Sequence, residues 1–211
     1  DSIDTPLFNR AVQGQYQPGS TIKPIIGLAA LDSGYTTPEF KMSDPGWYRL
    51  PGNERLYRDW NWRTTTDGGH GIVDLRKAIY QSCNIYFYSL AVKMGIDLID
   101  DYLALFGFGS NAILDFPEAS SGLLPTREWK KKNRGLPWYP GDTLNLGIGQ
   151  GDMLVTPLQL ATATSVIANR GKWIAPRMLK SGGGLPAESA VPGMENIDIP
   201  PANIWEYVIE S

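Results

Sequence analysis

A serine and a lysine stand three residues apart in the segment Tyr16-Gln-Pro-Gly-Ser-Thr-Ile-Lys-Pro24. The apolar residues that follow repeat at helical spacing, which predicts a helix over residues 21–33 with Ser20 at its start. Side chains three residues apart share one face of a helix, so Lys23 can reach the Ser20 hydroxyl. Burial or a neighbouring cation can lower the pKa of a lysine enough for it to accept a serine proton. The spacing is typical of a nucleophile beside its general base, although a capping serine beside a solvated lysine has the same pattern.

A second polar motif, Gln81-Ser82-Cys83-Asn84, lies between two segments of helical periodicity. Asp74 is the expected N-cap of the first segment, and Gly95 closes the second. A hydroxyl at such a joint can relay a proton, and a carboxamide can bind a peptide group through one donor and one acceptor. Ser82 and Asn84 are therefore candidate site residues. A simple capping turn is the alternative for this motif taken alone.

His70 and Cys83 are the single histidine and the single cysteine of the chain, so an internal disulfide is excluded. Asp44 and Asp59 lie in the same part of the sequence. Two carboxylates, an imidazole and a thiolate can together form a closed tetrahedral Zn²⁺ site. Taken one at a time, the histidine would be an exposed turn residue and the cysteine a small buried apolar group.

The two motifs and their surroundings resemble the class B penicillin-binding proteins, which are serine D,D-transpeptidases with a Ser-x-x-Lys motif. The similarity is greatest to the members that act in cell elongation, and it extends over about residues 1–180. Six further segments carry the resemblance: Asp44-Pro-Gly-Trp47, Tyr57-Arg-Asp-Trp60, Pro125-Thr-Arg-Glu-Trp-Lys130, Trp138-Tyr-Pro-Gly-Asp-Thr143, Gly147-Ile-Gly-Gln-Gly151 and Thr156-Pro-Leu-Gln-Leu160.

The resemblance implies an α/β (α+β) fold, shared by transpeptidases and β-lactamases, in which helices cover both sides of an antiparallel sheet. It also implies peptidoglycan cross-linking, in which Ser20 attacks a D-Ala-D-Ala stem peptide with Lys23 as base and forms an acyl-enzyme. Ser82 would pass a proton to the departing D-alanine, and Asn84 would hold the substrate amide. An amine of a neighbouring strand would then resolve the ester without any cofactor. β-Lactam antibiotics would acylate the same serine.

Partners, location and a metal follow from the same resemblance. The expected partners are a SEDS-family glycosyltransferase and other elongation proteins, at the periplasmic face of the inner membrane, with the membrane anchor outside this chain. Gram-negative members have a zinc site of the Asp, Asp, His, Cys type, and Asp44, Asp59, His70 and Cys83 look like its ligands. That metal would be structural. A serine β-lactamase, a non-catalytic penicillin sensor and an interaction module with vestigial motifs remain the alternatives.

The third motif of the family, Lys-Thr/Ser-Gly-Thr on an edge strand of the sheet, is not found at its expected place. Lys180-Ser-Gly182 imitates it, but the glycines and the proline that follow predict a turn at the end of a strand over residues 173–179. In the family a further helical segment precedes the motif, and here that segment is residues 202–210. Residues 1–211 are therefore expected to form one partial transpeptidase domain, without its C-terminal edge strands and inactive or nearly so by itself.

The composition fits a globular domain with an ordinary core. The net charge of −3 and the pI near 5.2 argue against nucleic acid as a partner. The basic run Lys130-Lys-Lys132 is expected to be a solvated helix face after an N-cap at Thr126. No apolar run approaches the roughly 20 residues that span a bilayer. Residues 147–151 lack the lysine of a nucleotide-binding loop. The aromatic residues within 45–62 are expected to pack on one another.

Periodicity and capping residues predict helices over residues 21–33, 74–81, 84–94, 97–106, 126–132 and 157–169. The last of these begins with Thr156 as N-cap and Pro157 at the first helical position. Only residues 173–179 are typical of a strand. The chain is therefore expected to be mostly helical.

Overall fold

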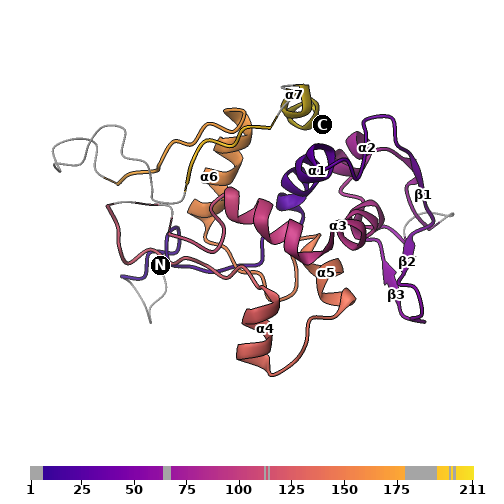
Figure 1. The fold of residues 1–211 in the computed structure, drawn as a ribbon, viewed down its shortest axis with the longest axis horizontal. Helices are drawn as coiled ribbons and strands as arrows, with labels where there is room; N and C mark the ends of the chain where they lie inside the picture. The colour runs from indigo at the N-terminus through magenta and orange to yellow at the C-terminus, as the bar shows by residue number, and fades with distance from the viewer. Residues whose placement is uncertain are drawn as a thin grey trace.

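The computed structural model describes residues 7–63, 68–111, 113, 115–178, 194–199, 201 and 203–211 (Figure 1). Its elements are, in chain order, the 3₁₀ helix η1 (Gly19–Ile22), α1 (Lys23–Asp32), β1 (Met42–Asp44), β2 (Trp47–Arg49), β3 (Leu56–Arg58), β4 (Gly71–Val73), α2 (Leu75–Tyr80), α3 (Asn84–Leu105), α4 (Arg127–Arg134), α5 (Pro140–Leu146), α6 (Pro157–Ala168) and α7 (Asn203–Ile209). Helices provide most of this regular structure, as the sequence predicts.

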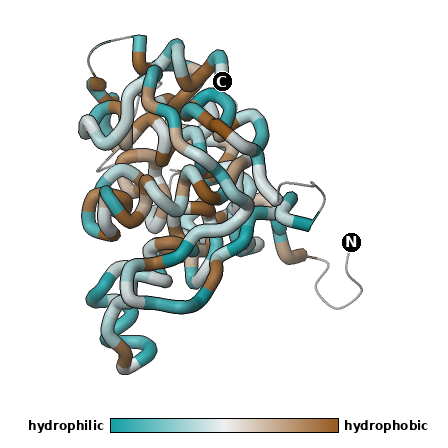
Figure 2. The backbone as a smooth tube through the Cα atoms, turned by 90° about the vertical axis from the view of Figure 1, so that its right-hand side faces the viewer, coloured by the Kyte–Doolittle hydropathy of each residue, from teal (hydrophilic) through white to brown (hydrophobic). Residues whose placement is uncertain are grey.

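Helix α1 lies at the centre of the molecule because it is apolar on every side. Every residue from Ile25 to Leu31 is buried. A helix without a polar face has to be covered all round, and α1 accordingly packs against α2, α3 and α7, while α5 packs against α3. Figure 2 shows many of the hydrophobic residues in the middle of the molecule. This core holds the residues at the start of α1 in place.

The helix ends follow the capping residues in the sequence. The side chain of Asp74 accepts a hydrogen bond from Lys77 N at 2.8 Å at the start of α2. Thr126 and Thr156 cap α4 and α6 in the same way. Gly95 has φ 77° and ψ 166°, which interrupts α3 between the two segments that the sequence predicts as separate helices. These predictions are confirmed.

Two small antiparallel sheets, which the sequence patterns do not predict, lie at one side of the molecule (Figure 1). β1 pairs with β4, and β2 pairs with β3. Tyr48 and Tyr57 lie opposite each other on β2 and β3, and their rings lie 6.1 and 5.9 Å from that of Tyr88 in α3. The aromatic residues of this segment therefore also pack against α3, a partner that the sequence did not predict.

Lys130 is buried, which corrects the expectation of a solvated basic face. It is 7% exposed, and its ammonium pairs with Asp142 of α5 and lies 4.8 Å from the ring centre of Tyr139. Lys131 and Lys132 are exposed as expected. The sequence analysis also missed α5, where Pro140 begins the helix and Asp142 accepts a hydrogen bond from Tyr139 N at 2.7 Å. The partner that buries Lys130 therefore comes from an unpredicted helix.

Residues 173–178 form no strand, so the predicted strand over 173–179 is wrong for the part that the structure describes. Trp173 N donates to the side chain of Asn196 at 2.9 Å, and Met178 N donates to Asp115 at 3.0 Å, so side chains take the place of a neighbouring strand. Leu179 and residues 180–182 lie outside the described residues. The helical segment predicted near the C-terminal end is confirmed as α7. Within the described part of the chain, none of the helices combines the length and the apolar character needed to cross a membrane.

Candidate active site and metal centre

Lys23, the first residue of α1, is 1% exposed and joins the two polar motifs. Its Nζ donates to the backbone oxygen of Ser82 at 2.8 Å, to Ser82 Oγ at 3.1 Å and to Asn84 Oδ1 at 2.7 Å. The ring centre of Phe87 lies 5.3 Å from Nζ. Burial lowers the pKa of Lys23 to about 8, although the negative charge of Asp59 works in the opposite direction. An amine with this pKa exchanges its proton near neutral pH.

Ser20 is an exposed residue of η1, directly before α1. No hydrogen bond joins Ser20 Oγ to Lys23 Nζ, although the structure describes both residues, so the contact expected from their spacing is not formed here. An ammonium group has three donors and no lone pair. All three donors of Lys23 are engaged with the second motif, which is the arrangement of a charged lysine. A neutral amine would have a lone pair for the Ser20 hydroxyl.

The turn before Ser20 rests on a second glycine turn, far away in the sequence. Gly19 has φ 58°, and its N–H donates to the backbone oxygen of Gly149 at 2.8 Å. Gly149 has φ 70°, and a Cβ built on it would lie 2.1 Å from the oxygen of Gly19. Position 149 therefore needs glycine for its backbone conformation and for the close approach.

We expect Gly149→Ala to lower the free energy of unfolding by about 3 kcal/mol, because left-handed strain adds to a clash with the Gly19 backbone. Gly52→Ala is the matched control, since Gly52 has φ 73° and its Cβ would meet nothing within 4 Å. The control should lose only about 1 kcal/mol. Urea unfolding of the two variants measures the difference, and equal losses would show that the two turns do not support each other.

The joint between α2 and α3 is a tight turn around Ser82. Ser82 has φ 55°, which is uncommon for a residue with a side chain, and its N–H donates to Ile79 O at 3.0 Å. Cys83 is the N-cap of α3, and its Sγ accepts a hydrogen bond from Tyr86 N at 3.4 Å. This turn brings the polar groups on both sides of Cys83 to the amine of Lys23.

Four side chains that the sequence analysis chose as metal ligands converge behind this joint. One ligand atom from each of Asp44, Asp59, His70 and Cys83 lies within 4.8 Å of the other three. His70 Nδ1 is 2.7 Å from Asp44 Oδ2 and 3.2 Å from Asp59 Oδ2. Cys83 Sγ is 3.3 Å from Asp44 Oδ2. A tetrahedral Zn²⁺ with bonds of about 2.0–2.3 Å holds its ligands about 3.3–3.8 Å apart, so small shifts of these atoms would fit the ion.

The two small sheets bring these ligands together. β1 pairs Asp44 with Gly71 of β4, and His70 N donates to Asp44 Oδ2 at 3.0 Å. In the second sheet, Asp59 directly follows β3, and its N–H donates to the backbone oxygen of Gly46, just before β2, at 2.9 Å. Because β2 follows β1 after two residues, both carboxylates lie at the same end of the two sheets.

Burial and neighbouring groups shift the pKa values of the cluster in different directions. Burial raises the pKa of Asp59, and the charge of Asp44 raises it further. Burial likewise raises the pKa of the Cys83 thiol. For Asp44 the effect of burial is outweighed by hydrogen bonds from the backbone of His70 and Gly46, which hold its pKa below the ordinary value. A divalent cation would favour the deprotonated form of all these ligands.

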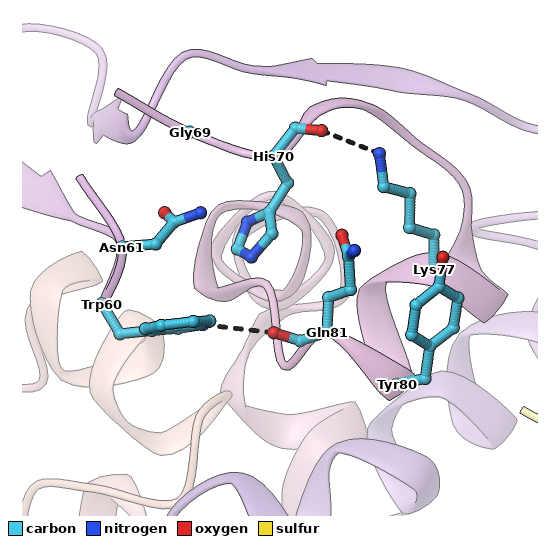
Figure 3. A pocket seen from close by; sticks show the side chains of 7 residues that line it. All are labelled: Trp60, Asn61, Gly69, His70, Lys77, Tyr80 and Gln81. Carbon is cyan, nitrogen blue, oxygen red and sulfur yellow. Dashed lines mark hydrogen bonds between the residues drawn. The ribbon is translucent and has the colours of Figure 1, made fainter. Parts of the chain in front are cut away.

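The cluster and the Ser82 turn are directly connected. Asp59 Oδ2 accepts a hydrogen bond from Asn84 N at 3.1 Å. The next residue, Trp60, donates from its indole nitrogen to Gln81 O at 3.1 Å (Figure 3). Neither Trp60 nor Gly149 was predicted from the sequence to be a site residue. Their contacts join segments that are far apart in the sequence, and no local sequence pattern predicts such contacts.

Comparison with known proteins identifies the family of this chain. The family model of the penicillin-binding protein transpeptidase domain matches residues 1–206. The peptidoglycan D,D-transpeptidase MrdA of Acinetobacter baumannii is 46% identical over 181 residues, which cover 86% of this chain and 26% of that protein. The chain therefore spans about a quarter of the length of this curated relative.

Solved structures show the same similarity across almost the whole chain. The crystal structure of Pseudomonas aeruginosa PBP2 in complex with WCK 5153 has a TM-score of 0.89 at 47% identity, and the match covers 99% of this chain and 46% of that one. PBP2 of Helicobacter pylori in its complex with MreC has a TM-score of 0.84 at 30% identity, with 99% and 36% covered. The predicted fold class is thus confirmed, and this chain belongs to the penicillin-binding protein transpeptidase domain family.

Proposed function

We propose that the protein carrying this chain is a peptidoglycan D,D-transpeptidase in which Ser20 is the nucleophile and Lys23 its general base. The observation that carries the proposal is the buried amine of Lys23, whose pKa is lowered to about 8 and which binds Ser82 and Asn84 across 59 and 61 residues of sequence. A base poised near neutral pH is what serine activation requires. Relatives named peptidoglycan D,D-transpeptidase support the reaction class.

The reaction divides into acylation and transfer. The neutral amine of Lys23 takes the hydroxyl proton while Ser20 Oγ attacks the carbonyl carbon between the two D-alanines of a stem peptide. The carbon–nitrogen bond then breaks, and the proton reaches the departing D-alanine through Ser82 Oγ, 3.1 Å from Lys23 Nζ. An amine of a neighbouring strand attacks the ester, a new amide bond forms, and Ser20 recovers its proton. Asn84 holds the substrate amide through its side chain.

We expect Ser20→Ala to abolish covalent labelling of the intact protein by fluorescent penicillin, because no other residue is proposed to carry the acyl group. Labelling should fall at least about 10³-fold, to the detection limit on a denaturing gel. Ser89→Ala in α3 is the control and should label normally. Undiminished labelling of the Ser20→Ala protein would refute the nucleophile.

The fate of the acyl group that a thioester substrate leaves on the protein also distinguishes the remaining alternatives. A transpeptidase passes its acyl group to an added D-amino acid, a β-lactamase releases it rapidly to water, and a sensor retains it. Transfer from a thioester substrate to glycine or D-alanine, followed by mass spectrometry, is the expected outcome. Rapid hydrolysis without transfer would favour the hydrolase instead.

We also propose that Asp44, Asp59, His70 and Cys83 hold a structural Zn²⁺. The support is their convergence within 4.8 Å and the chemistry of the donor set. The bound ion supplies fixed ligand geometry and no step of the reaction. Asp59 binds the backbone N–H of Asn84, so a fixed Asp59 also fixes the turn that presents Ser82 and Asn84.

The proposed location is the periplasmic face of the inner membrane. The H. pylori relative has been solved with MreC, and we propose a partner of that kind, together with a SEDS-family glycosyltransferase of the elongation machinery. β-Lactams are the proposed inhibitors, since they mimic the D-Ala-D-Ala terminus and would acylate Ser20.

A further inference from the structure

A cavity of 510 Å³ is lined by His70, one of the four proposed metal ligands, and by Gln81 (Figure 3). His70 and Gln81 enter it from different elements, since His70 precedes β4 and Gln81 is the C-cap residue after α2. Two buried polar atoms in this cavity, His70 Nε2 and Gln81 Oε1, have no hydrogen-bond partner among the described residues. Buried polar groups are normally paired, so both atoms require an explanation.

The tautomer of His70 supplies that explanation. Nδ1 is the ring nitrogen that faces the carboxylates of Asp44 and Asp59. If Nδ1 binds a metal, its lone pair is used and the ring proton has to be on Nε2. Nε2 then becomes an N–H donor at the cavity, and Gln81 Oε1 is an acceptor at the same cavity.

Two other donors around the cavity are already engaged. Lys77 Nζ donates to the backbone oxygens of His70 and Ile72 at 2.8 and 3.0 Å. Trp60 Nε1 donates to the backbone oxygen of Gln81 and not to its side chain. His70 Nε2 is therefore a complementary group, itself buried and without a partner among the described residues, for the buried amide oxygen of Gln81.

We propose that Gln81 is a positioning residue of the metal centre, which accepts the Nε2 proton of His70 directly or through one water and so holds Nδ1 toward the metal. Metal-bound histidines usually donate their second ring nitrogen to such a partner. The two groups are not within hydrogen-bond distance in this structure, and the cavity has room for a side-chain rotation or a bridging water. This inference rests on the proposed zinc site and extends it to a residue directly before Ser82.

The test is the zinc affinity of the intact protein and of three variants, measured by competition with a chromogenic chelator. Gln81→Leu removes the acceptor and should weaken zinc binding about 10- to 100-fold. Gln81→Glu keeps an acceptor and should stay within about 3-fold of the wild type. Tyr80→Phe is the matched control, because Tyr80 lines the same cavity without being assigned to His70, and its affinity should not change.

A second readout separates positioning from a general effect on folding. In ¹⁵N NMR spectra of the zinc-loaded protein, His70 should carry its proton on Nε2 in the wild type, and this signal should broaden or shift in Gln81→Leu while the metal-free melting temperatures stay alike. Equal zinc affinity and an unchanged His70 signal in Gln81→Leu would overturn the role of Gln81 but leave the zinc site intact. A wild-type protein that binds no zinc would overturn the zinc site itself and this inference with it.

Discussion

Replacing Lys23 by methionine is expected to slow acylation of the intact protein by penicillin about 10³-fold, the range that a general base contributes. Methionine has a similar length and keeps the buried stem, but it has no lone pair that accepts a proton at neutral pH. The acylation rate constant can be followed by stopped-flow fluorescence. Lys93→Met is the control, because Lys93 is exposed on α3 and should react at the wild-type rate.

The pH dependence tests the same residue independently. Burial lowers the pKa of Lys23 to about 8, so below that pH the amine is mainly charged and cannot take the Ser20 proton. The acylation rate should therefore rise about tenfold per pH unit well below pH 8 and level off above it. This rise of the acylation rate with pH should be absent in Lys23→Met. A rate that is constant from pH 6 to 9.5 in the wild type would contradict the assignment of Lys23 as base.

Removal of zinc is expected to lower the melting temperature of the intact protein by about 10 °C. Zinc at about 1,000 times its dissociation constant stabilises the folded state by about 4 kcal/mol, and about 1 kcal/mol shifts the melting temperature of a domain of this size by about 2–4 °C. The physical cause is the cluster itself: Asp44 and Asp59 are each 2% exposed and lie beside one imidazole, so without a cation their charges repel.

Cys83→Ala gives the matched comparison for this loss. The variant lacks the thiolate ligand, so it should melt at the same temperature with and without a chelator and bind no zinc in elemental analysis. Penicillin acylation should also fall in this variant and in the chelated wild type, since Asp59 holds the N–H of Asn84. Wild-type protein that melts identically with zinc and with chelator would exclude a structural metal.

Local structure around the site could be predicted from local signals. Asp74, Thr126 and Thr156 cap the helices that their sequences predict, since a capping side chain binds an N–H only two or three residues away. The kink at Gly95 follows in the same way from a residue that tolerates positive φ. The strands could not be predicted, because three residues are too short to show a period of two.

The amino-acid sequence by itself determined which groups are available: the Ser20 and Lys23 spacing, the Ser82 and Asn84 motif, and four candidate ligands that include the single histidine and the single cysteine of the chain. Tertiary structure alone decided which of them meet. The amine of Lys23 hydrogen-bonds to Ser82, which is 59 residues away, and not to Ser20. Asp44 lies within 3.3 Å of Cys83, which is 39 residues away. Hydrogen bonds and burial depend on distance in space, and periodicity or capping reports only on neighbours within about one helical turn.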